Sequence, residues 1–246
     1  MTYTDVQDMA AKIMGRCSGP IMGWWAAASA LEAICIGLLT ADVTAAQPAP
    51  GLGVFEMWRV FAGASGVELV LAAAIVAAGL FRTALYRPMR DAVVDDVHRS
   101  RREVFRMALS RMLPVFAASQ VVGLFVVLAA AVSLLLGLLF PLFPQLIVSF
   151  TLAPTVYFVA AREERLSQAI GSALTATHRF WVFTFGVQCL LTTLAVLLNS
   201  WFQSYAGFAG GHGVVFSLFF VFLFFAYRFA EWISLSAVYL SVDEHL

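Results

Sequence analysis

The sequence is poor in charge and almost devoid of lysine. Charged residues make up 12% of the 246 positions, and Lys12 is the only lysine. A soluble globular chain has about a quarter of its residues charged, and a chain that is 61% hydrophobic lacks the polar side chains to cover a soluble core. The net charge of zero gives no support for a nucleic-acid partner. The composition therefore argues against a soluble domain and predicts the lipid bilayer as the surrounding medium.

Cysteine and histidine are also scarce. The three cysteines show no metal-ligand spacing, and Cys35 and Cys189 fall in apolar segments, where cysteine behaves as a small hydrophobic residue. None of the four histidines lies in the middle of an apolar segment, and the sequence has no HExxH, P-loop or GxGxxG motif. We therefore expect no metal site, no cofactor and no catalytic residue, and we interpret the chain as not an enzyme.

What the sequence does have is apolar length. Residues 112–161 and 180–227 contain no charged residue, and each is long enough for two membrane crossings of about 20 residues. Backbone polar groups in lipid have to pair within their own segment, so these segments are predicted to be helices. We predict an all-α fold, a polytopic membrane helix bundle that forms a single transmembrane domain over 1–246. The six transmembrane helices are expected at about 20–41, 57–81, 112–140, 144–161, 180–202 and 214–242.

Arginine sets the predicted orientation of these spans. Every basic residue except Arg59 and Arg228 falls in the N-terminal segment, in 82–111 or in 162–179, and the connections 42–55 and 203–213 hold none. The positive-inside rule places such basic segments in the cytoplasm. We expect a multi-pass protein of a bacterial inner (plasma) membrane, with both termini in the cytoplasm (N-in and C-in).

The two cytoplasmic segments, 82–111 and 162–179, are predicted to be amphipathic. In the first, Pro88 can open a helix, and apolar residues recur at spacings of three, four or seven, namely Met89, Val93, Val97, Val104 and Met107. The same segment carries a basic surface of Arg99, Arg101, Arg102 and Arg106. Two interpretations stay open: a docking platform for a partner or for anionic lipid, or a solvated helix that only fixes the topology.

The second basic segment carries a resemblance to a known family. The stretch 151–187, "TLAPTVYFVAAREERLSQAIGSALTATHRFWVFTFGV", has an Ala-Pro in one helix, an x-A-I-x-x-S pattern in the cytoplasmic segment and aromatic residues that open the next helix. The residues concerned are Ala153, Pro154, Ala169, Ile170, Ser172, Phe180 and Trp181. In this the chain resembles bacterial six-helix membrane proteins related to the membrane domain of glycerophosphoryl diester phosphodiesterase. The resemblance implies a six-helix bundle, whereas the phosphodiesterase activity is not expected, because this chain lacks the soluble catalytic domain.

Four ionisable residues fall inside the predicted spans. They are Glu32, Glu68, Arg228 and Glu231. A charge near the bilayer centre costs about 2.5–3.5 kcal/mol on insertion scales, so these residues are expected to face the bundle interior and to pair with one another. We predict an intramembrane ionic cluster, with Tyr227 and Trp232 as additional hydrogen-bond or cation–π partners. One arginine against three glutamates leaves an excess of negative charge, and both a structural tie and a proton or substrate pathway remain open.

A serine motif offers a remote alternative. Gly63-Ala64-Ser65-Gly66 matches the G-x-S-G of rhomboid intramembrane proteases, and His212 is the only candidate base for that serine. Rhomboids place the serine on the fourth helix, whereas Ser65 falls on the second. Close helix packing through Ala62 and Gly66 is the competing interpretation.

The sequence thus favours a non-catalytic integral membrane subunit or scaffold of an inner-membrane assembly. Spans five and six are rich in phenylalanine, as in 216–225, "FSLFFVFLFF". We expect these spans to contact another membrane protein or a second copy of the chain. A small transporter or channel that uses the intramembrane glutamates and arginine is the alternative.

Overall fold

The computed structural model describes residues 1–17, 19–45, 66–135, 142–206 and 213–245, and every element in these ranges is an α-helix. The all-α fold class is confirmed for this part of the chain. In chain order the helices are α1 (Tyr3–Arg16), α2 (Pro20–Ala45), α4 (Gly66–Ala84), α5 (Tyr86–Val93), α6 (Arg101–Leu135), α7 (Leu142–Ala161), α8 (Leu166–Ala206) and α9 (Gly213–His245).

Several of these helices are long and apolar enough to cross a membrane. Within the described ranges the stretches that qualify are Gly66–Val93, Arg101–Leu135, Pro144–Ala161 and Leu166–Leu198. The consecutive helices α1 and α2 meet at 93°, and they add a fifth candidate if the bent pair counts as one span. The described part of the protein therefore has four or five candidate membrane spans. Helices α2 and α9 also overlap the predicted spans 20–41 and 214–242.

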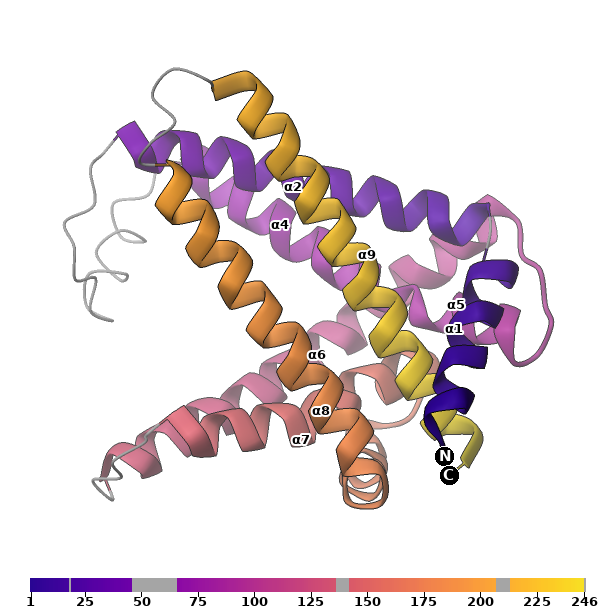
Figure 1. Ribbon diagram of the computed structural model, residues 1–246. Helices are drawn as coiled ribbons and strands as arrows, with labels where there is room; N and C mark the ends of the chain where they lie inside the picture. Colours follow the sequence, from indigo (N-terminus) through magenta and orange to yellow (C-terminus); the bar gives the residue numbers. More distant parts are fainter. Residues whose placement is uncertain (18, 46–65, 136–141, 207–212, 246) are drawn as a thin grey trace.

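Both chain termini lie at one end of the molecule, together with α5 and the segment 94–100 (Figure 1). This end is termed the basic end, because segments 82–111 and 162–179 carry most of the arginines. From it, α2 and α4 run side by side in one direction, and α6 and α7 run side by side in another (Figure 1). The two pairs meet where α4 packs against α6, and the last helix, α9, packs against α1, α2 and α8.

The apolar face predicted from Pro88 onward in the segment 82–111 does not belong to one continuous helix. Helix α5 ends at Val93, residues 94–100 are not helical, and α6 then runs from Arg101 into the predicted third span without a break. The physical reason is a capping box: the Glu103 carboxylate accepts from the Ser100 amide at 2.8 Å, while Ser100 Oγ accepts from the Glu103 amide at 3.4 Å. This box starts a new helix at Arg101 and leaves Val97 exposed.

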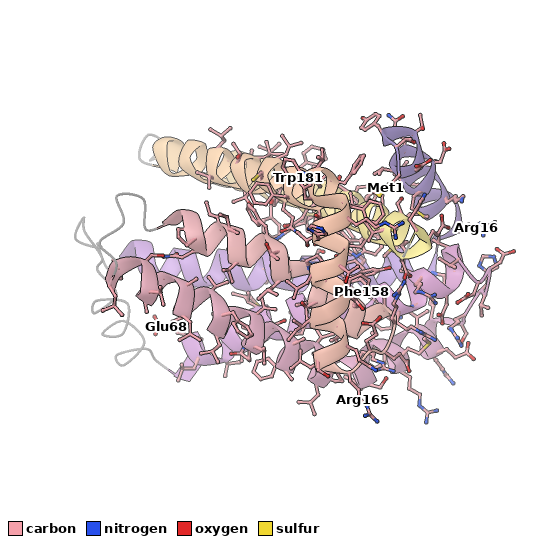
Figure 2. The ribbon with its side chains drawn as sticks, turned by 90° about the horizontal axis from the view of Figure 1, so that it is seen from below. Met1, Arg16, Glu68, Phe158, Arg165 and Trp181 are labelled. Atoms are coloured by element: carbon pink, nitrogen blue, oxygen red, sulfur yellow. The ribbon has the colours of Figure 1, made fainter. Side chains whose placement is uncertain are left out.

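Helix α8 changes direction at Phe180, whose backbone leaves the helical region (φ −127°, ψ 34°). The stretch between Arg165 and Trp181 runs crosswise to the long helices, as Figure 2 shows. The break falls where the sequence analysis places the boundary between the amphipathic segment 162–179 and the span that begins at 180. The crosswise stretch packs through small side chains that are almost fully buried, namely Ala169, Ala173 and Ala176.

The hydrophobic core lies mainly at the basic end. Its fully buried side chains come from α1, α5, the end of α7 and the end of α9, and include Met9, Ile13, Met89, Tyr157, Phe158, Val238 and Leu240. Helix α1 was not expected from the sequence. It begins at a capping box between Thr2 and Asp5 and buries Met9 and Ile13, which are four residues apart on one face. This first helix closes the core against α9 and α5.

Candidate functional site

An ion quartet joins three helices in the interior of the bundle. It consists of Glu32 on α2, Arg82 on α4, and Arg228 and Glu231 on α9. Arg228 Nη2 donates to Glu32 Oε1 at 2.9 Å, and Arg228 Nη1 donates to Glu231 Oε2 at 2.8 Å. Arg82 Nη1 donates to Glu32 Oε2. Glu32, whose side chain is only 4% exposed, therefore lies between the two arginines and links α4 to α9.

Local sequence explains how each helix presents its charge. Arg228 and Glu231 are three residues apart, which places them on the same helical face. Arg82 lies in the last turn of α4, where the helix dipole favours a positive side chain. Glu32 follows the small residues Ala28 and Ser29 on the buried face of α2, and these allow the helices to approach closely.

Three of the four predicted cluster residues are brought together, and one is not. Glu68 lies in the first turn of α4, fourteen residues before Arg82, which is about 21 Å along the axis at 1.5 Å per residue. Side chains cannot span that distance, so the prediction that Glu68 joins the cluster is wrong. The fourth member is Arg82, which the sequence analysis placed in a cytoplasmic loop. Because two arginines face two glutamates, the ionised quartet is neutral.

Two aromatic side chains of α9, Tyr227 and Phe224, contact the quartet. The Tyr227 hydroxyl donates toward Glu231 Oε1 at 3.4 Å and toward the Leu191 carbonyl of α8 at 3.3 Å. The guanidinium of Arg228 lies 5.3 Å from the centre of the Phe224 ring, a cation–π contact. Trp232, which was expected to assist the cluster, instead packs on Trp25 with ring centres 5.7 Å apart. The aromatic contacts of the quartet thus come from Phe224 and Tyr227, both on α9.

A second ionic network fastens the basic end. Asp243, near the end of α9, accepts from Arg90 Nε of α5 at 2.9 Å and from Arg162 Nε after α7. Asp91 is almost fully buried and pairs with Arg99 at 2.7 Å. The predicted basic surface is therefore divided. Arg99 is engaged by Asp91, whereas Arg101, Arg102 and Arg106 are exposed on the first turns of α6 and make no ion pair within the described part of the chain.

The structure describes only some of the residues that the sequence analysis considered for catalysis. Ser65 and His212 of the protease alternative lie outside the described residues. Within the described ranges, no group of three His, Cys, Asp or Glu residues is placed to hold a metal ion. The interaction that the quartet shows is charge pairing, since each of its carboxylates accepts a hydrogen bond from an arginine.

Signals for the missed residues are present in the sequence. Arg82 directly follows the apolar run 69–81 with no turn residue between them, so it could be placed in the last turn of the helix, where the dipole favours it. The Ser100/Glu103 and Thr2/Asp5 pairs have the capping-box spacing.

Comparison of the chain with protein-family models, curated proteins and solved structures finds no match. The resemblance of 151–187 to the six-helix membrane proteins stays a prediction.

Proposed function

We propose that the protein is a non-catalytic subunit or scaffold of an inner-membrane assembly, in which α2, α4, α6, α7, α8 and α9 cross the bilayer. The six helices overlap the six apolar segments of the sequence. In this placement the basic end, with both termini, lies in the cytoplasm. The concentration of arginine in 82–111 and 162–179 supports this orientation.

The neutral quartet is the observation that carries the proposal. A proton or ion pathway needs a group that can change charge or exchange its partner during transport. Here Glu32 accepts from two arginines, and Glu231 accepts from Arg228 and Tyr227. With Arg82 in place of Glu68, the excess negative charge expected from the sequence is absent from the quartet. The quartet is therefore best explained as a tie between α2, α4 and α9.

The exposed apolar surfaces of the candidate spans supply the second argument for a subunit. Half of the span window in α7 is buried, whereas the windows of α6 and α8 are 11% and 17% buried, so both of these helices leave apolar surface exposed. Helix α8 carries exposed leucines four residues apart, Leu190 and Leu194, and on α9 Phe222 is 66% exposed. The side chains of 216–221 lie outside the described part. Lipid does not drive helices together, so association requires complementary packing, and α8 with α9 is the surface that we assign to a partner or a second copy.

The test is purification from the native membrane in a mild detergent, followed by native mass spectrometry. We expect a complex of fixed stoichiometry with a second membrane protein or with a second copy. The variant Leu190→Trp/Leu194→Trp should reduce the complexed fraction, because two bulky rings disturb the packed surface. The matched control is Leu124→Trp/Leu128→Trp on α6, which places the same change on two exposed leucines at the same spacing.

A monomer in native membranes would overturn the proposal. Proton or ion flux through reconstituted protein that disappears in Arg228→Leu, with folding intact, would assign the quartet to transport instead.

A further inference from the structure

An apolar cavity of about 270 Å³ opens between α2, α4 and α6. Small side chains leave this room, namely Ala27 and Ala28 of α2 and Ala77 and Ala78 of α4. Every lining side chain is apolar apart from the indole nitrogen of Trp24, and that nitrogen already donates to the Arg101 carbonyl at 2.9 Å. The cavity therefore offers no free polar group to a polar ligand, and it fits a hydrocarbon chain.

Three aromatic rings mark the end of the cavity nearest to the basic end. The Trp24 ring lies 4.8 Å from the Phe105 ring and 6.0 Å from the Phe81 ring, and the Phe81 and Phe105 rings are 5.6 Å apart. On each of the three helices, the ring belongs to the lining residue that lies closest to the basic end. Helices α2 and α6 begin at that end, and α4 ends there (Figure 1). Tryptophan, represented here by Trp24, is enriched at the level of lipid headgroups.

The exposed arginines lie beside this end of the cavity. Arg101 and Arg102 precede Phe105 by four and three residues, so they share its helical face. Their neighbours Arg99 and Arg111 are paired with Asp91 and Glu163, whereas Arg101, Arg102 and Arg106 make no ion pair with any described residue. The one acidic residue in these turns, Glu103, is held by the amide and hydroxyl of Ser100. The first turns of α6 therefore present net positive charge.

We propose that this site binds one anionic phospholipid of the cytoplasmic leaflet, with an acyl chain in the cavity and the headgroup phosphate on Arg101, Arg102 and Arg106. The inference rests on the membrane placement proposed above. An acyl chain in the bilayer is already surrounded by hydrocarbon, so its transfer into the cavity gains little hydrophobic free energy. Selectivity between lipids should therefore come from the charge of the headgroup. Each arginine near the surface should favour the anionic lipid about five-fold.

The experiment titrates the purified, delipidated protein with phosphatidylglycerol or with phosphatidylcholine of the same chain length and counts bound lipids by native mass spectrometry. We expect one phosphatidylglycerol to bind before any phosphatidylcholine does. The triple variant Arg101→Gln/Arg102→Gln/Arg106→Gln should lower that affinity about 100-fold, as three five-fold effects multiply. Its control is Arg165→Gln, an exposed arginine away from the cavity.

A second variant tests the cavity. Ala77→Phe fills the space at an exposed position that lines it, and Ala73→Phe makes the same change one turn away, outside the lining. Quenching of tryptophan fluorescence by phosphatidylglycerol with brominated chains should fall in Ala77→Phe and persist in Ala73→Phe.

Equal binding of phosphatidylglycerol and phosphatidylcholine, or an unchanged affinity in the triple arginine variant, would overturn the proposal. A bound protein, detected by its mass in place of the mass of a lipid, would also overturn the proposal. Because a bound lipid and a bound protein differ in mass, this experiment distinguishes lipid binding from the subunit assembly tested above.

Discussion

The central role of Glu32 leads to a graded prediction for the ion quartet. Replacing Glu32 with Gln leaves Arg82 without an ion partner in the described part of the chain and gives the quartet a net positive charge. Breaking a buried pair from one side destabilises a protein by about 3–5 kcal/mol, which is between about two and four powers of ten in the folded-to-unfolded ratio. Arg82→Gln should cost less, because Glu32 keeps its 2.9 Å contact with Arg228.

The double variant is the decisive one. In Glu32→Gln/Arg82→Gln the remaining pair, Arg228 with Glu231, is neutral again and still in contact at 2.8 Å. We expect this double variant to be more stable than Glu32→Gln alone, with a coupling energy of about 2 kcal/mol, as contacting residues show. Unfolding titrations with SDS in mixed micelles, followed by tryptophan fluorescence, measure these free energies.

Additive single effects, within about 0.5 kcal/mol, would refute the pairing between Glu32 and Arg82. Glu68→Gln is the matched control, since it removes the same charge from the opposite end of α4. A loss for Glu68→Gln as large as that for Glu32→Gln would contradict the assignment of the quartet.

Three further outcomes are expected from the basic end. Asp243→Asn should destabilise the fold by about 2 kcal/mol in the same titration, since Asp243 accepts from two arginines; an unchanged free energy would exclude a role in fastening α9. Ala173→Leu, at a fully buried position, should cost about 1–3 kcal/mol, whereas Leu174→Ala, which is exposed, should stay within about 0.5 kcal/mol. Burial raises the pKa of the Cys17 thiol to about 12, so the thiol stays protonated at pH 8 and maleimide should label it only after unfolding. Rapid labelling of the folded protein would contradict this burial.

The parts of the structure that depend on local spacing could be predicted from the sequence. The all-helical fold follows from apolar length, and the Arg228–Glu231 pair follows from a three-residue spacing on one helix. The break at Phe180 is indicated by the change from an amphipathic to a continuously apolar pattern. These features need no knowledge of which helices are neighbours.

The parts that depend on depth and on helix order could not be predicted. The sequence places Glu68 inside the second apolar segment, but on α4 it lies fourteen residues before Arg82, about 21 Å along the axis, and so at the end of the helix away from the quartet. The positive-inside rule assigns Arg82 to a cytoplasmic loop, because arginine usually marks that side. Its true environment depends on Glu32, fifty positions earlier on a neighbouring helix, and no local pattern contains that information.

The way the quartet divides among the helices has a consequence for synthesis. Glu32 and Arg82 belong to α2 and α4, which pack side by side and leave the ribosome early, and their charges cancel. Arg228 and Glu231 belong to the last helix and cancel within it. In the membrane placement proposed above, each unit therefore enters the bilayer with its charge already compensated, and the final contact from Arg228 to Glu32 forms only after α9 has arrived. In a chain truncated before α9, Glu32 would keep Arg82 as its ion partner and would lose its contact with Arg228.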